Sequence, residues 1–111
     1  MRSPRQVLDG LLRDLEGALR AAELWEAAAP APAALESIEP FCVDTLRLPQ
    51  WLQWVFLPRM RAVLDARAPL PAKCGIAAMA EMSFVEQRNA AVARVVELLR
   101  AIDQVVEGDC G

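Results

Sequence analysis

The sequence contains no histidine among its 111 residues, and only three of them are cysteine. The lack of histidine removes the commonest general base, the commonest metal ligand and the usual switch of charge near neutral pH. Cys42, Cys74 and Cys110 are odd in number and widely spaced, so no Cys-x-x-Cys pair is present for zinc binding or thiol exchange. We therefore expect isolated reduced cysteines, no metal, no cofactor and a cytoplasmic location.

The chain also lacks an excess of positive charge. It carries 12 Lys and Arg residues against 15 Asp and Glu residues, a formal net charge of −3. Direct binding to nucleic acid usually depends on a basic face that releases counterions, so we expect none here. Charged residues interrupt the leucines near the N-terminus, and no run approaches the ~20 apolar residues of a membrane span. The sequence predicts neither a signal peptide nor contact with a membrane.

Glycine and phenylalanine are scarce, with five and three copies respectively. The abundance of Ala, Leu, Arg and Glu favours helix over strand, and no alternation of apolar and polar residues persists long enough for a strand. A first amphipathic helix is predicted from about residue 4 to 27, with Ser3 as its N-cap. Residues 27–34 read as a loop of Ala and Pro. Residues 37–46 predict a short helix or turn, with Phe41 and Leu46 pointing inward.

A central helix is predicted from about residue 49 to 66, because this segment is apolar around most of its circumference. Pro58 lies inside it and cannot donate to the carbonyl of Trp54, so we expect a kink there, unless the helix restarts at this point. A short helix near residues 76–82 and a long helix over residues 84–106 follow, with Gly108 as a C-terminal cap. Arg88 and Asp103 interrupt the apolar stripe of the last helix and are expected to be solvated, with a partly buried ion pair elsewhere in the bundle as the weaker alternative.

Together these elements predict an all-α fold, a small helical bundle of four to five helices with a kinked, largely buried central helix. At this length we expect one domain that spans residues 1–111.

Four blocks of the sequence together resemble the YqcC-like family of small bacterial cytoplasmic proteins: Phe41…Asp44-Thr45, Trp51-Leu52-Gln53-Trp54, Pro58-Arg59-Met60 and Pro69-Leu70-Pro71. The resemblance covers almost the whole chain and implies a helical bundle whose function is mostly unknown. It also implies a link to tRNA pseudouridine synthase C, whose gene is commonly a neighbour. This chain is too short for the mixed α/β catalytic domain of such an enzyme, so the resemblance implies at most an accessory role beside it.

The candidate residues for interaction or ligand contact are Asp44, Trp51, Gln53, Trp54 and Arg59. Trp51 and Trp54 lie one helical turn apart and either fill the core or anchor a partner or a stacked base. Gln53 either satisfies backbone groups or contacts a ligand. Asp44 either caps the central helix or takes part in binding. Arg59 either bonds carbonyls freed by Pro58, pairs with Asp44, or binds a partner.

No pattern in the sequence supports catalysis, because a hydrolase triad lacks its base and no Glu-x-x-His pair exists for a dinuclear metal site. We expect no catalytic residue and no enzyme activity. The leading hypothesis is a cytoplasmic protein-interaction module that uses the face of Trp51 and Trp54 to bind another protein or a second copy of itself. The alternative is an accessory factor in tRNA modification, which contacts a tRNA-modifying enzyme or its RNA. A weaker third hypothesis is a small-ligand pocket lined by Gln53, Trp54 and Arg59.

Overall fold

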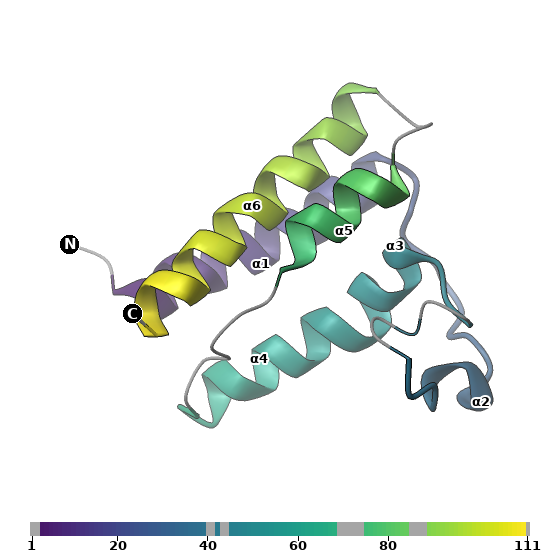
Figure 1. The fold of residues 1–111 in the computed structure, drawn as a ribbon, viewed down its shortest axis with the longest axis horizontal. Helices are drawn as coiled ribbons and strands as arrows, with labels where there is room; N and C mark the ends of the chain where they lie inside the picture. The colour runs from purple at the N-terminus through teal and green to yellow at the C-terminus, as the bar shows by residue number, and fades with distance from the viewer. Residues whose placement is uncertain (1–2, 40–41, 43–44, 69–74, 85–88, 111) are drawn as a thin grey trace.

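The computed structural model describes residues 3–39, 42, 45–68, 75–84 and 89–110, and every regular element in these ranges is helical (Figure 1). This confirms the predicted all-α fold. In chain order the elements are α1 (Pro4–Ala21), α2 (Pro32–Leu35), α3 (Leu48–Trp51), the π-helical turn η2 (Leu52–Phe56), α4 (Leu57–Asp65), α5 (Ile76–Ser83) and α6 (Ala90–Cys110).

Helix α1 begins where the sequence predicts, because its first turn is fully capped. The Ser3 hydroxyl accepts from the backbone N–H of Gln6 at 3.2 Å, and the Gln6 side chain accepts from the backbone N–H of Ser3 at 3.0 Å. This reciprocal capping box satisfies two of the backbone donors that a helix start leaves open. Pro4 occupies the first helical position, where its missing N–H has no cost.

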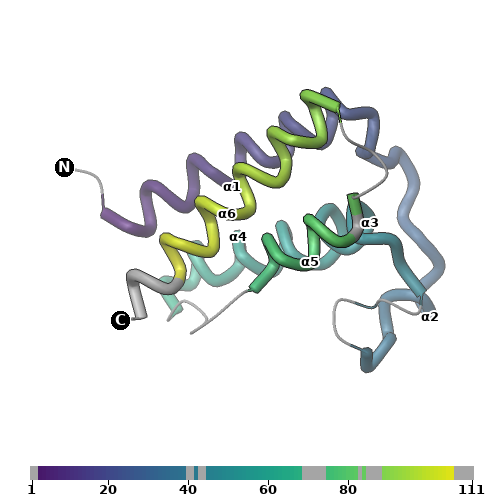
Figure 2. The backbone as a smooth tube through the Cα atoms, turned by 45° about the horizontal axis from the view of Figure 1, so that its top comes forward, coloured from purple at the N-terminus to yellow at the C-terminus, as the bar shows by residue number. Residues whose placement is uncertain are grey.

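Helices α1 and α6 lie side by side and run in opposite directions, so that the start of α1 and the end of α6 lie at the same end of the molecule (Figures 1 and 2). Each contributes apolar residues at three- and four-residue spacing to a shared core. Helix α5 packs against α6, and the segment α3–η2–α4 completes the bundle. The most deeply buried side chains of α1 and α6 are Leu8, Leu12, Leu15, Leu19, Val95, Leu99, Ile102 and Val106.

In the central segment from α3 to α4, a π-helical turn lies just before Pro58. The N–H of Leu57 donates to the carbonyl of Leu52, five residues back instead of four. The wider turn ends at Leu57, so Pro58 lies in the first turn of α4, where a missing N–H is tolerated. The structure accommodates Pro58 with a π-helical turn just before it and a new α-helix that begins at Leu57, and the predicted kink stays a prediction. Leu52, Gln53 and Phe56 of this turn are all buried.

Several local predictions need correction. Helix α2 begins at Pro32, inside the segment expected to be a loop, and α6 begins at Ala90, so Phe84 precedes it as the cap of α5. Gly108 lies inside α6, which continues to Cys110. Leu46 is buried as expected, whereas Phe41 and Arg88 fall outside the described residues.

Asp103 is a clear departure from the prediction that it would be solvated. Its carboxylate accepts from the backbone N–H groups of Ile76 at 3.3 Å and Ala77 at 2.9 Å, the first two residues of α5. The residue before this helix is Gly75, which has φ of +61° and no side chain with which to cap it. Asp103 therefore caps α5 from the neighbouring helix and fixes the position of α5 on α6.

Replacing Asp103 with alanine should lower the free energy of unfolding by about 1–2 kcal/mol, because two backbone donors at the start of α5 lose their acceptor. Urea denaturation of Asp103→Ala measures this loss. Asp14→Ala, at an exposed position of α1, is the matched control and should change stability by less than ~0.5 kcal/mol. Equal stability of the two variants would contradict the capping role.

Candidate functional site

The site is built on the loop that follows α1, and this loop begins earlier than the predicted helix end near residue 27. Glu23 has a left-handed backbone with φ of 61°. Its N–H donates to the carbonyl of Arg20 at 3.1 Å, and the N–H of Leu24 donates to that of Leu19 at 2.9 Å. This pair of hydrogen bonds is the Schellman motif, which usually places glycine at the left-handed position. Because the residue here is glutamate, the sequence carried no stop signal.

Glycine in place of Glu23 should stabilise the protein by about 1 kcal/mol, since the left-handed backbone costs a residue with a Cβ atom about that much. Thermal and urea denaturation of Glu23→Gly measure the gain. Ala22→Gly is the matched control, because Ala22 has an ordinary right-handed backbone and should gain nothing. A loss of stability in Glu23→Gly would show that its side chain makes a compensating contribution.

Gln53 holds the end of this loop. Its amide oxygen accepts from the backbone N–H of Glu26 at 2.7 Å, and its amide nitrogen donates to the carbonyl of Glu26 at 2.7 Å. Gln53 is only 5% exposed and comes from the π-helical turn. The Gln53 amide thus forms with the backbone of Glu26 the same pair of hydrogen bonds that a neighbouring β-strand would form. Of the two roles considered for Gln53, the structure assigns the backbone role.

The side chain of Glu26 is also held, by neutral donors of the same central segment. The amide nitrogen of Gln50 lies 3.3 Å from both carboxylate oxygens, and the indole nitrogen of Trp54 lies 3.4 Å from Oε1. The Trp-Leu-Gln-Trp block therefore contacts Glu26 through backbone and side chain together. Sequence reasoning missed Glu26, because nothing in its Ala-rich surroundings distinguishes it from a solvated surface charge.

The three tryptophans of the chain are all half-buried. Trp51 packs on the core and stacks on Phe56, with ring centroids 5.5 Å apart and an angle of 29° between the planes. The guanidinium carbon of Arg20 lies 4.6 Å from the ring centroid of Trp25, a cation–π arrangement. Trp25 and Trp51 pack against the core, Trp54 contacts the Glu26 carboxylate, and all three indoles keep part of their surface in solvent. Trp51 packs on the core, one of the roles considered for the two tryptophans, and the role of the pair as an anchor for a partner stays a prediction.

Arg59 is exposed on α4 and forms no hydrogen bond or ion pair with the other described residues. It does not join the contacts around Glu26. Asp44 falls outside the described residues, so its capping role and its pairing with Arg59 stay predictions. The hypothesis of a ligand pocket lined by Gln53, Trp54 and Arg59 is weakened, because both amide atoms of Gln53 are engaged by Glu26.

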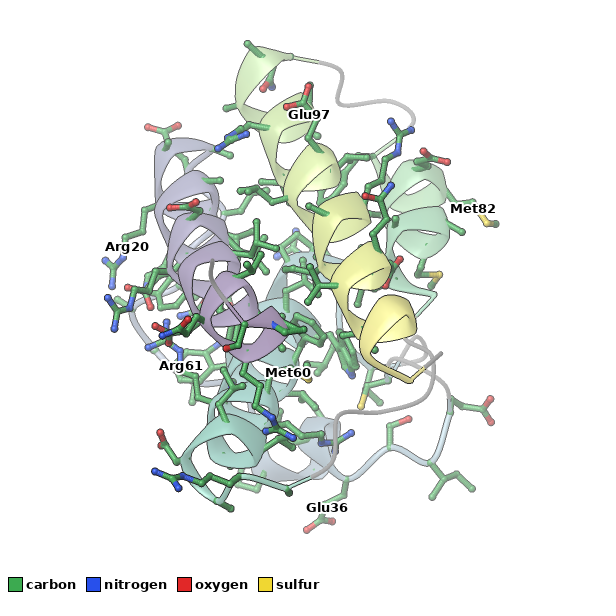
Figure 3. All side chains as sticks on the ribbon, turned by 90° about the vertical axis from the view of Figure 1, so that its left-hand side faces the viewer. Arg20, Glu36, Met60, Arg61, Met82 and Glu97 are labelled. Atoms are coloured by element: carbon green, nitrogen blue, oxygen red, sulfur yellow. The ribbon has the colours of Figure 1, made fainter. Side chains whose placement is uncertain are left out.

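Charged side chains link α1 and α4 at the surface. Glu16 of α1 lies 3.4 Å from Arg20 of the same helix and 3.4 Å from Arg61 of α4. Figure 3 shows Arg20 and Arg61 along one side of the molecule, with Met82 on the opposite side. These pairs are solvent-exposed, so each contributes at most about 1 kcal/mol to stability.

A surface groove of about 450 Å³ lies between α5 and α6. Phe84, Val92 and Val96 form its apolar lining, and an ion pair between Glu81 and Arg100 lies at its rim. Within the described ranges, no three His, Cys, Asp or Glu side chains are grouped so that they could hold a metal ion. No helix in those ranges is both long and apolar enough to cross a membrane.

Comparison with known proteins identifies the family of this chain. The family DUF446, described as "tRNA pseudouridine synthase C", matches residues 7–105. The chain belongs to this family, the YqcC-like proteins. The solution NMR structure of YqcC from Escherichia coli superimposes with a TM-score of 0.84 at 30% identity, covering 99% of this chain and 93% of that one. The resemblance inferred from the sequence is thereby confirmed.

Two curated YqcC-like relatives have no assigned function. An uncharacterized protein of Haemophilus influenzae is 40% identical over 75 residues, which are 68% of this chain and 71% of that protein. YqcC of Escherichia coli K12 is 40% identical over 73 residues, 66% of this chain and 67% of its own length.

A third relative bears the name of an enzyme. The protein named tRNA pseudouridine synthase C of Pectobacterium carotovorum is 50% identical over 60 residues, which are 54% of this chain. The match spans only 16% of the Pectobacterium protein. Most of the Pectobacterium protein thus has no counterpart in this YqcC-like chain.

Proposed function

We propose that this chain is a non-enzymatic, cytoplasmic protein-interaction module. Large apolar side chains at its surface support the proposal. Trp51 and Trp54 are half-buried one helical turn apart, and Leu35, Ile38 and Met82 are exposed. Aromatic and aliphatic side chains that remain in water are typical anchors of protein interfaces.

The more specific candidate is an accessory factor in tRNA modification that acts beside a tRNA pseudouridine synthase. The observation that carries it is the match to the Pectobacterium protein of that name, in which a segment similar to this chain forms 16% of the polypeptide. Covalent joining keeps two parts at high effective concentration, which favours contacts between them. A family member that is not joined covalently to the enzyme would have to bind it non-covalently.

The charge of the chain favours contact with the enzyme over contact with RNA. The formal net charge is −3, and phosphate groups repel such a surface. An enzyme that binds tRNA must itself present positive charge to the phosphates, and that charge attracts an acidic partner. The chain then adds a binding surface or a stabilising contact, and the enzyme supplies the chemistry.

A gel-shift assay tests this proposal. Unmodified tRNA is mixed with the chain, with a purified tRNA pseudouridine synthase C, and with both, at about 50 mM and about 200 mM salt. We expect no shift by the chain alone and a further shift when the chain is added to the enzyme–tRNA complex. A salt-sensitive shift by the chain alone would show direct phosphate contact and overturn the assignment to the enzyme.

Association of two copies through the Trp51 and Trp54 face is the remaining form of the interaction hypothesis. Sedimentation velocity of the chain alone distinguishes it. A dimer that dissociates in Trp54→Ala would favour this form, provided that circular dichroism shows the variant to be folded.

A further inference from the structure

Acidic residues are distributed unevenly along the chain. Residues 21–46 contain five acidic residues, Glu23, Glu26, Glu36, Glu39 and Asp44, and no lysine or arginine. The rest of the chain holds 10 acidic and 12 basic residues. One continuous segment therefore carries all of the net negative charge, although the total of −3 is modest.

The same segment exposes apolar side chains. Leu35 is 37% exposed and Ile38 is 97% exposed, and both follow Pro32 at three-residue spacing. Glu36 and Glu39 alternate with them and are also exposed. Helix α2 lies at a corner of the molecule, apart from the pair α1 and α6 (Figures 1 and 2). We call Pro32, Leu35, Glu36, Ile38 and Glu39 the acidic apex.

Specific hydrogen bonds hold the acidic apex in place. The hydroxyl of Thr45 donates to the carbonyl of Ala34 at 2.6 Å. The N–H of Glu39 donates to the Ser37 hydroxyl at 3.1 Å, and the N–H of Cys42 donates to the carbonyl of Glu39 at 3.0 Å. The apolar side chains are thus presented on an ordered backbone, which lowers the entropy lost on binding.

An isolated exposed apolar side chain is ordinary, and Met82 on α5 is such a case at 74% exposure. The acidic apex differs because two large apolar side chains share a short segment with carboxylates of one sign. An apolar centre with a charged rim is the usual composition of a protein interface. The sign of the rim indicates the charge of the partner.

We infer that the acidic apex is the surface by which this chain docks onto a partner protein, and that the partner presents an apolar recess rimmed by Lys and Arg. The inference rests on the proposed function, which names a tRNA pseudouridine synthase as that partner. Charge complementarity supports the choice, since a tRNA-binding enzyme needs basic surface and residues 21–46 carry only negative charge. RNA does not fit this surface, because its phosphates would face Glu36 and Glu39.

Titration calorimetry with a purified tRNA pseudouridine synthase C tests the inference. The double variant Leu35→Ala with Ile38→Ala should weaken binding about tenfold or more, as truncation of interface anchors does. Met82→Ala is the matched control, an exposed apolar residue on another helix, and should bind within about twofold of the wild type. All of these positions are exposed, so circular dichroism melting should show unchanged folding.

A second comparison tests the charge. Glu36→Gln with Glu39→Gln should slow association several-fold at low salt and reduce its dependence on salt. Glu97→Gln, at an exposed acidic position of α6, is the control and should leave the association rate unchanged.

The outcomes separate the inference from the proposed function. If the wild-type chain does not bind the enzyme, both are overturned. If it binds and the apex variants bind equally well, only the acidic apex is overturned. If Trp54→Ala weakens binding and the apex variants do not, the tryptophan face is the docking surface and the inference is again overturned. Loss of binding in the apex variants alone supports it.

Discussion

Replacing Gln53 with leucine should lower the free energy of unfolding by about 3 kcal/mol. Leucine retains most of the volume, but it leaves the backbone N–H and carbonyl of Glu26 without partners. Each buried backbone group that loses its hydrogen bond costs about 1–3 kcal/mol. Gln53 itself is only 5% exposed, so water has poor access to the groups left behind. Urea denaturation with a two-state fit measures the change.

Two controls separate the backbone contacts of Glu26 from those of its side chain. Glu26→Ala removes the carboxylate contacts of Gln50 and Trp54 but keeps both hydrogen bonds of Gln53. Gln50→Leu removes a contact to a half-buried carboxylate and the hydrogen bond from the solvent-exposed backbone N–H of Arg47. Each control should cost less than about 1 kcal/mol. A Gln53→Leu variant no less stable than these controls would contradict the role of Gln53 as the clamp of the loop.

Truncation of Leu99 to alanine should cost about 3–4 kcal/mol, within the range for a large-to-small change in a closed core. Leu99 is fully buried in α6, the helix that pairs with α1, and lies in the main core cluster. A small domain has about 5–15 kcal/mol of total stability, so the variant should lie near the limit of folding. Chemical denaturation at low temperature, where the variant remains folded, measures the loss.

The matched control is Leu35→Ala, which makes the same chemical change at a position that is 37% exposed on α2. It should cost less than about 1 kcal/mol. Similar losses at Leu35 and Leu99 would mean that α1 and α6 do not form the stabilising core of the molecule.

Periodicity predicted that two long helices exist but not that they pair, and the predicted start of the second near residue 84 lies six residues before α6 begins. The stripe of α1 and its Ser3 cap are visible in the sequence, and both are present in the structure. The predicted end of α1 is wrong because Glu23 adopts the left-handed conformation that glycine usually adopts at the end of a helix. Asp103 was placed in solvent because its partners, two backbone N–H groups of α5, carry no sequence signature. The local sequence pattern specifies that a helix forms, but not which side chains of another helix contact it.

The location of the candidate site could be predicted from the sequence, but the hydrogen bonds within it could not. The Trp-Leu-Gln-Trp block marks the π-helical turn that contacts the loop after α1. Pairing between Gln53 and the backbone of Glu26 joins positions 27 residues apart. Backbone groups look the same in every sequence, so such a pairing cannot be read from residue types. The acidic segment, in contrast, is visible in the sequence, and only its exposed apolar side chains required the structure.

Sedimentation velocity of the chain mixed with a tRNA pseudouridine synthase C, in the absence of RNA, tests the central proposal most directly. The proposal is that this helical protein works by binding that enzyme. We predict that the chain sediments with the enzyme as a stoichiometric complex, which weakens as salt is raised. Independent sedimentation of the two proteins at every concentration and salt level would contradict the account.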